Sequence, residues 1–193
     1  MRVEALLWDF GDTLVDETWM HRAPPDCARW PEAWADVMAQ YADDWNTGRV
    51  DERAVFGALC AHTCLDFDAV ERHAADCCRS IERHPVAWQV MTGRRRPQAL
   101  VTVNPDLFVH RVLTPHGLAE HFDTVVVSCL EGTDDKVQLC CVACERLGVT
   151  DRGRALLIDN RRDLVDAWQR AGGAAYWYRS DAQFRDDVDG LLA

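Results

Sequence analysis

A short apolar run near the N-terminus, ending on an acid, most constrains what this chain can fold into. Residues Val3 to Trp8 are largely apolar and are followed by Asp9 and by a Gly11-Asp12 pair. An apolar run bounded by turn residues is typical of a buried strand. In open α/β sheets, ligands bind beyond the carboxyl ends of the strands, where Asp9 would lie. A carboxylate there can bind a metal or act as a nucleophile, although Gly-Asp pairs are also ordinary turn residues.

The C-terminal half of the chain alternates short apolar runs with helical segments. This alternation favours parallel strands joined by helices, and therefore a Rossmann-like α/β core with a parallel sheet flanked by helices. Further strands are predicted at residues 98–103, 124–128, 154–158 and 174–178. Helices are predicted at residues 86–91, 104–113, 134–147, 163–171 and 181–192.

Between the first strand and this core, residues 16–85 are helical in character. An apolar face at spacings of three and four predicts one amphipathic helix, and Asp51 and Asp66 or Asp68 can cap two more. That face consists of Trp30, Trp34, Val37, Met38, Tyr41 and Trp45. We interpret the aromatic residues mainly as core. The expected division is a core domain of residues 1–15 and 86–193 with a helical cap of residues 16–85. On the link between them, Trp19, His21 and Arg22 could face a substrate.

Composition excludes some classes of partner. The net charge of −11 disfavours nucleic acid and anionic membranes, which bind clustered cations, but permits a small phosphorylated substrate. No apolar stretch approaches the length of a membrane span, and the N-terminus lacks a signal-peptide layout, so we expect a cytoplasmic protein. We expect it to be either a monomer or a homodimer. The nine cysteines are interpreted as small packing residues rather than as disulfides or zinc ligands.

Polar residues at three other predicted element ends could join Asp9. Thr102 stands near a strand tip, and Asn104-Pro105 predicts an immediate helix N-terminus, which together make an anion site. Lys136 is the single lysine beside 20 arginines, and it opens a predicted helix where a cation opposes the helix dipole. A purely structural helix would disfavour that placement, so a functional role is indicated.

A fourth predicted strand ends on Asp159, and Asp163 follows four residues later at the start of a helix. Two acids in this arrangement can both turn toward one cation. Alone, this spacing is a weak signal because Asp also caps helices.

In this order, the residues resemble the motifs of the haloacid dehalogenase-like (HAD) hydrolase superfamily. Its first motif is Asp-x-Asp-x-Thr-Leu, which Asp9, Thr13 and Leu14 match. Thr102 matches the second motif, and Lys136 matches the lysine that follows. The pair Asp159 and Asp163 matches the fourth motif. The resemblance covers residues 1–15 and 86–193, and the helical segment matches the family's substrate-selecting cap only in position and character.

The resemblance implies a phosphatase that acts on a small phosphomonoester through an aspartyl-phosphate. Asp9 would be the nucleophile, and Mg²⁺ would be bound by Asp9, the Gly11 carbonyl and Asp159, with Asp163 orienting the site or a metal-bound water. Charge on the phosphoryl group would be stabilised by Thr102, by Lys136 and by backbone N–H groups near Val103 and Asn104.

One departure concerns the acid-base residue, because the family's second Asp falls on Gly11. We expect Asp12 or a cap residue to substitute in part. The departure also leaves open a catalytically weak module that binds a phosphorylated ligand or protein partner. A 2-haloacid dehalogenase is a less favoured alternative, since it attacks carbon without a metal and would not need Asp159 and Asp163 together. A phosphomutase would need the missing Asp, and a phosphonate hydrolase would need a cap lysine that is absent from this sequence.

Overall fold

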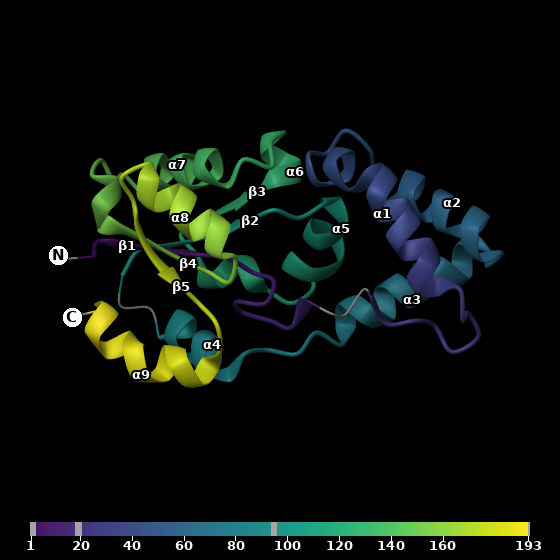
Figure 1. Cartoon of the computed structure of the whole chain (residues 1–193), viewed down its shortest axis with the longest axis horizontal. Coiled ribbons are helices and arrows are strands. Elements are labelled where there is room, and N and C mark those ends of the chain that lie inside the picture. Colours follow the sequence, from purple (N-terminus) through teal and green to yellow (C-terminus); the bar gives the residue numbers. More distant parts are fainter. Residues whose placement is uncertain (1–2, 18–20, 94–95, 193) are drawn as a thin grey trace.

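A parallel sheet forms the centre of the computed structural model (Figure 1), which describes residues 3–17, 21–93 and 96–192. Its five strands lie in the order β3-β2-β1-β4-β5, and every neighbouring pair is parallel. The strands are β1 (Ala5–Trp8), β2 (Gln98–Thr102), β3 (Thr124–Val127), β4 (Ala155–Asp159) and β5 (Ala174–Trp177). The predicted α/β fold class is confirmed.

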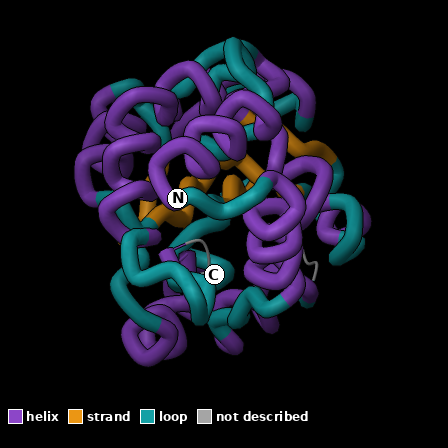
Figure 2. Tube along the Cα trace, turned by 90° about the vertical axis from the view of Figure 1, so that its right-hand side faces the viewer, coloured by secondary structure: helices purple, strands orange, loops and turns teal. Residues whose placement is uncertain are grey.

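Helices cover both faces of the sheet. Leu7 on β1 packs into a buried cluster with residues of α7 (Lys136–Arg146) and α8 (Arg162–Arg170). Leu6 and Trp8, which alternate with it, face α4 (Pro85–Thr92) and α9 (Asp181–Leu192) on the other side. Viewed from the end opposite the chain termini, the strands lie between layers of helices (Figure 2). Side chains alternate along a strand, so a near-continuous apolar run can serve both layers.

A helical bundle lies at one end of the molecule, away from both termini (Figure 1). It consists of α1 (Trp30–Asn46), α2 (Glu52–Thr63) and α3 (Phe67–Arg79). Asp51 caps α2 and Asp66 caps α3, as two of the predicted helix starts require. Buried residues of the bundle form one cluster with the α4 and α9 face of the sheet. None of the helices in the described ranges is long and apolar enough to cross a membrane.

Asp106 joins the bundle to the core. Its carboxylate accepts hydrogen bonds from Trp45 Nε1 (2.7 Å) on α1 and from the backbone N–H of Glu52 (3.0 Å) on α2. Arg111 forms an ion pair with the same Glu52 at 2.8 Å. These contacts hold the bundle over the carboxyl end of β2.

The prediction of one helix from residue 104 to residue 113 is wrong. The Asn104 side-chain amide instead donates to Thr102 Oγ1 (2.7 Å), and Pro105 is extended, with a ψ of 178°, at the N-cap position. The helical segment starts after Pro105 and is divided into α5 (Asp106–Phe108) and a π-helical turn, η2 (Val109–Leu113). Short elements that were not predicted are α6 (Ser128–Glu131), η3 (Leu118–His121) and η4 (Arg152–Arg154).

Candidate active site

The carboxyl ends of three adjacent strands bring the predicted residues together. Asp9 follows β1, Thr102 ends β2 and Asp159 ends β4. The strand registers pair Trp8 with Leu100 on one side and with Ile158 on the other, so these ends lie beside one another. All three polar side chains are buried or nearly so. Burial of the two aspartates is unusual for acids that have neither a function nor a partner.

Lys136 supplies the cation at this edge. Its Nζ lies 2.5 Å from Asp9 Oδ1 and 2.7 Å from the carbonyl oxygen of Val101, and it is almost fully buried. Burial alone would lower the pKa of Lys136, but the carboxylates of Asp9 and Asp159 outweigh it and raise this pKa above its ordinary value. The ammonium is therefore charged at neutral pH, and its unfavourable position at a helix start is explained by its two acidic partners.

Asp9 is held from two sides. Its Oδ2 accepts a longer hydrogen bond from Thr13 Oγ1 (3.4 Å), and Thr13 Oγ1 in turn accepts from the backbone N–H of Asn160 (3.1 Å). Burial and then the neighbouring Asp159 raise the pKa of Asp9 to about 6, against the opposing effect of Lys136. The Lys136 ammonium opposes this rise and so favours the carboxylate form that a nucleophile requires.

Asp159 has a buried oxygen without a hydrogen-bond donor. The backbone N–H of Arg161 donates to Oδ1 (2.8 Å), but Oδ2 accepts no hydrogen bond from any described residue. Lys136 Nζ is in ionic contact with this Oδ2 at 3.1 Å. Buried polar atoms normally take part in hydrogen bonds, so a buried carboxylate oxygen that accepts none suggests a ligand.

The donor set fits Mg²⁺. This ion prefers oxygen ligands and is commonly bound through one or two carboxylates, with water or substrate phosphate completing its shell. Asp9 and Asp159 are two such carboxylates, and Asp159 Oδ2, which accepts no hydrogen bond from the described residues, is available as a ligand. No group of three or more His, Cys, Asp and Glu side chains suited to a metal occurs among the described residues, so the site is not a full protein cage.

Thr102 and Asn104 form a small polar cluster at the end of β2. Asn104 Nδ2 donates to Thr102 Oγ1 (2.7 Å), which leaves the hydroxyl hydrogen of Thr102 to be donated elsewhere. The Asn104 backbone N–H, predicted to contact phosphate, is already bonded to Ser128 Oγ. Val103 lines a neighbouring cavity, and its predicted backbone contact with phosphate stays a prediction.

The structure does not bring Asp163 to the other acids. Its side chain is largely exposed and pairs with Arg161 at 2.7 Å, which lowers its pKa. Within the described part of the chain, no hydrogen bond or ion pair joins Asp163 to Asp9 or to Asp159. Its predicted part in metal binding stays a prediction.

Glu17 is a residue that the sequence analysis did not single out. A Cβ atom built on Gly11 would lie 2.4 Å from the Glu17 carboxyl carbon, so this carboxyl group occupies the place of a residue 11 side chain. The residue as a whole keeps an exposed surface, but its carboxyl group is crowded, and this burial, followed by the charges of Asp9 and Asp12, raises its pKa to about 7. The sequence signal that could have identified Glu17 is its position, because it is an acid six residues after Gly11, where the first motif lacks its second Asp.

Asp12 lies in the turn that follows β1. Its side chain is exposed, its backbone has a positive φ of 51°, and its Oδ1 accepts the backbone N–H of Glu17 (3.0 Å). No described contact joins its carboxylate to Asp9. The structure therefore assigns Asp12 to the turn that orients Glu17, and a direct catalytic role for Asp12 stays a prediction.

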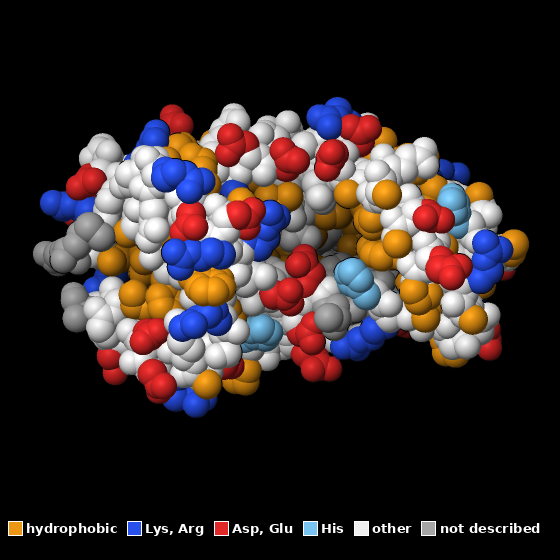
Figure 3. Space-filling model, in the orientation of Figure 1, with side chains coloured by type: hydrophobic (Ala, Val, Ile, Leu, Met, Phe, Trp, Pro, Cys, Tyr) orange, Lys and Arg blue, Asp and Glu red, His pale blue; other side chains and the backbone are white. Residues whose placement is uncertain are grey.

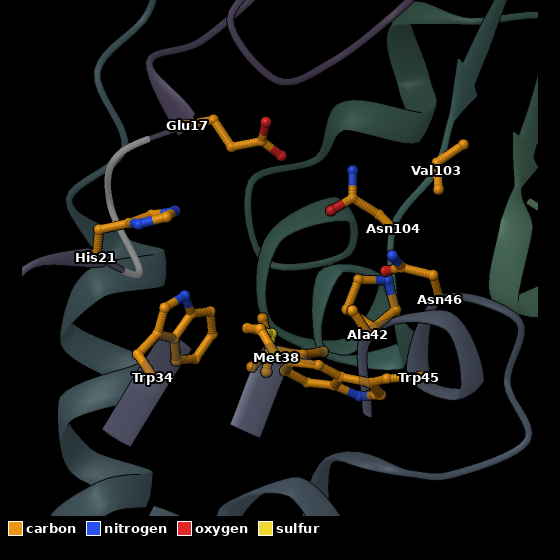
Figure 4. Close-up of a pocket in the computed structure, with 11 residues that line it drawn as sticks. Glu17, His21, Trp34, Met38, Ala42, Trp45, Asn46, Val103 and Asn104 are labelled. Atoms are coloured by element: carbon orange, nitrogen blue, oxygen red, sulfur yellow. The ribbon is translucent and has the colours of Figure 1, made fainter. Parts of the chain in front are cut away.

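A cavity of about 160 Å³ lies between the core and the bundle. Figure 4 shows Glu17 and Asn104 on one side of it, with His21 and Trp34 on another and Met38 and Trp45 across from Glu17. In Figure 3 the surface is hollowed between the two halves of the molecule, with hydrophobic side chains on the bundle side. The lining residues are Glu17, His21, Trp34, Met38, Ala42, Trp45, Asn46, Val103, Asn104, Pro105 and Leu107.

Some of the predicted cap residues are buried in the core, and others line this cavity. Trp30 and Val37 are fully buried in the core, as interpreted, whereas Trp34 and Met38 line the cavity. On the link, His21 lines the cavity and Arg22 pairs with Glu82 (3.4 Å). Trp19 lies outside the described residues.

Comparisons with known proteins find similarity in structure only. No family model matches the chain, and no curated protein matches its sequence. A predicted HAD-like family hydrolase from Porphyromonas gingivalis is similar over 100% of this chain and 98% of its own, with a TM-score of 0.70 and 14% identity.

Two further solved structures differ in what they bind. A HAD family enzyme from Bacteroides thetaiotaomicron, in complex with magnesium and inorganic phosphate, has a TM-score of 0.68 and 11% identity, covering 92% of this chain and 95% of its own. An L-2-haloacid dehalogenase from Xanthobacter autotrophicus, with chloropropionic acid covalently bound, has a TM-score of 0.64 and 19% identity, covering 99% and 84%. Identities this low establish the fold alone, and on that ground the chain has the fold of the HAD-like hydrolases.

Proposed function

We propose that this chain is a Mg²⁺-dependent phosphatase that hydrolyses a small phosphomonoester through an aspartyl-phosphate on Asp9. The observation that carries the proposal is the pair of buried acids at the sheet edge. Asp9 is held 2.5 Å from the Lys136 ammonium, and Asp159 offers a buried oxygen that has no hydrogen-bond donor among the described residues. A cation and a phosphoryl group would satisfy this edge together.

Each residue of the site would have its own role in phosphoryl transfer. A carboxylate oxygen of Asp9 attacks phosphorus, the bond from phosphorus to the alcohol oxygen breaks, and water later cleaves the acyl phosphate to regenerate Asp9. Lys136 and the Thr102 hydroxyl stabilise charge on the phosphoryl oxygens. Bound Mg²⁺ would be held by Asp9, the Gly11 carbonyl and Asp159, where it reduces repulsion between the acids and the phosphate.

The cavity supports a compact, partly apolar alcohol group in the substrate. Its volume of about 160 Å³ is close to the roughly 150 Å³ of an engineered cavity that binds benzene. Trp34, Met38 and Trp45 supply apolar and aromatic surface, while Asn104 supplies a polar group at the phosphate end. A phosphomonoester with one ring or a short branched chain matches this size and polarity.

A 2-haloacid dehalogenase is the second candidate, because the family's acid is replaced by Gly11 and several similar structures are dehalogenases. Asp9 would then attack carbon and displace a halide. Asp159 favours the phosphatase, because its buried Oδ2 accepts no hydrogen bond from the described residues and has the Lys136 ammonium at 3.1 Å as an ionic contact, which leaves room for a cation to bind there. A binding module without turnover is the remaining alternative.

The test is release of inorganic phosphate from a panel of small aryl and alkyl phosphates, with Mg²⁺ and with EDTA. We expect release only with Mg²⁺, and none from Asp9→Asn, which is nearly isosteric but lacks the nucleophile. Halide release from 2-chloropropionate without Mg²⁺ would support the dehalogenase instead. Mg²⁺ binding without release of either product would support the binding module.

A further inference from the structure

The carboxyl group of Glu17 fills the space above Gly11. A Cβ atom on Gly11 would lie 2.4 Å from Glu17 Cδ and Oε2 and 2.6 Å from Oε1, all below the 3.0 Å that real Cβ contacts respect. A side chain at residue 11 and the present position of Glu17 therefore exclude each other. The acid that the first motif lacks at residue 11 is replaced in space by an acid from residue 17.

The turn after β1 is built to return the chain over itself. Asp12 has a positive φ of 51°, and its backbone N–H donates to the Val15 carbonyl (2.7 Å). Its carboxylate then accepts the backbone N–H of Glu17 (3.0 Å). The neighbouring Asp16 N–H donates to the Glu82 carbonyl (2.8 Å), which ties this segment to the chain returning from the bundle. The position of Glu17 is thus fixed by the backbone on both sides of the turn.

The Glu17 carboxylate has no structural partner that explains its position. Across the described ranges it accepts no hydrogen bond and forms no ion pair, whereas its backbone N–H donates to Asp12 Oδ1. It lines the cavity and points into the space that the Asn104 amide also faces (Figure 4). It therefore stands between the turn that carries Asp9 and the cavity assigned to the alcohol group.

We propose that Glu17 is a catalytic residue that exchanges protons with the alcohol oxygen and then with water, in the place that Gly11 leaves open. The proposal rests on the proposed phosphatase function. In the first step Asp9 attacks phosphorus, the phosphorus–alcohol bond breaks, and the carboxyl proton of Glu17 moves to the alcohol oxygen. In the second step water attacks phosphorus, its proton moves to the Glu17 carboxylate, and the bond between Asp9 and phosphorus breaks.

The first test compares substrates with poor and good leaving groups. Glu17→Gln should lower kcat/KM for an alkyl phosphate by about 100- to 10,000-fold, the usual range for general acid-base catalysis. For 4-nitrophenyl phosphate, whose phenolate leaves without a proton, the loss in kcat/KM should be several-fold at most. Glu82→Gln is the matched control. Glu82 is an exposed acid whose backbone contacts the same turn through Asp16, and its side chain does not line the cavity. It should leave both substrates unchanged.

The second test measures a covalent species rather than turnover. With 4-nitrophenyl phosphate, Glu17→Gln should accumulate the phosphorylated protein, seen as the mass of one added phosphoryl group, because water attack has lost its base. The phosphorylated form should be absent from Asp9→Asn and scarce in the wild type. Moving the acid back to residue 11, in Gly11→Asp with Glu17→Ala, should recover activity on the alkyl phosphate at least tenfold over Glu17→Ala alone.

The outcomes separate this proposal from the phosphatase assignment. Phosphate release that needs Mg²⁺ and Asp9, but falls equally for both leaving groups in Glu17→Gln with no phosphorylated protein, would overturn the role of Glu17 alone. Wild-type silence on every phosphate would overturn the phosphatase assignment and this role with it. The leaving-group dependence, the trapped intermediate and the rescue together are the result expected.

Discussion

Two aspartates near the ends of neighbouring strands are used in opposite ways. Asp181, shortly after β5, accepts the backbone N–H groups of Val86 (2.9 Å) and Ala87 (3.1 Å) and the hydroxyl of Tyr178 (2.9 Å). Both of its oxygens are satisfied, and it joins α4 to α9. Asp159, at the end of β4, is fully buried yet leaves one oxygen without a hydrogen-bond donor among the described residues.

The difference teaches how a structural acid is distinguished from one positioned for a ligand. Burial by itself would raise the pKa of Asp181, but the amide groups and the tyrosine hydroxyl outweigh it and lower this pKa. A carboxylate that stabilises the fold is stabilised in its charged form by fixed donors. Asp159 at the sheet edge has instead one oxygen whose described contact is the Lys136 ammonium at 3.1 Å and which accepts no hydrogen bond, and each prediction below tests this difference.

The largest effect on stability should follow loss of the shared cation. Lys136→Met leaves Asp9 and Asp159 buried without compensation, so we expect the free energy of unfolding to fall by about 3–5 kcal/mol. Urea denaturation would measure it. Adding Asp159→Asn to Lys136→Met should recover part of the loss, because one buried charge is removed. Arg154→Met, which breaks an exposed pair with Glu4, is the control and should change stability little. Equal losses in both would contradict a special role for Lys136.

The second prediction separates catalysis from stability at Asp159. Asp159→Asn should reduce Mg²⁺-dependent phosphate release by at least about 100-fold, since losing even a second-shell partner of a metal costs up to that factor. Its stability should stay close to that of the wild type, because one of two adjacent buried acids is neutralised. Steady-state assays and urea denaturation on the same sample give both values. A stable fold with full activity would show that Asp159 is structural.

The third prediction concerns Asp181 and pH. Its pKa is lower in the folded than in the unfolded protein, so its contribution to stability is present above the unfolded pKa and is lost as pH falls through the folded pKa. Asp181→Asn should cost about 0.5–2 kcal/mol at neutral pH, comparable to losing a helix cap. The difference from wild type should shrink below pH about 3–4, near the ordinary Asp pKa. A difference independent of pH would contradict the sign, and loss of activity per folded molecule would contradict a structural role.

The smallest effect should be on substrate choice in the cavity. Trp34→Ala should raise KM for an aryl phosphate by roughly 2- to 10-fold, as expected for an aromatic contact of about 0.5–1.5 kcal/mol. KM for ethyl phosphate, which does not reach Trp34, should change less. Steady-state assays of each substrate measure the two KM values, and competition between the substrates measures the ratio of their kcat/KM values. An equal change for both would place the alcohol group elsewhere.

Much of the sheet edge was predictable because its geometry follows from chain order. Parallel strands bring their carboxyl ends to one edge, so Asp9, Thr102 and Asp159 could be grouped without coordinates. Lys136 was identified because a cation at a helix start is locally unfavourable. Its two acidic partners supply the missing stabilisation.

The remaining features depend on contacts that local sequence does not encode. Asn104 has the residue type of a helix cap, but its backbone is bonded to Ser128 at the start of α6, and Pro105 stands at the N-cap position. Glu17 reaches Gly11 only because Asp12 adopts a positive φ and reverses the chain. Long-range partners and turn geometry therefore decided the outcome at each of these residues.

Calorimetric titration of Mg²⁺ in the presence of inorganic phosphate tests the central claim most directly, because it needs no knowledge of the substrate. The wild type and Asp181→Asn should bind one Mg²⁺ with similar affinity, while Asp159→Asn should bind at least about tenfold more weakly. The same titration of Asp163→Asn tests the predicted part of Asp163 in metal binding, because its carboxylate is exposed and paired with Arg161. Absence of binding to the wild type, or equal binding to Asp159→Asn, would contradict the assignment of this sheet edge as a magnesium-dependent phosphoryl-transfer site.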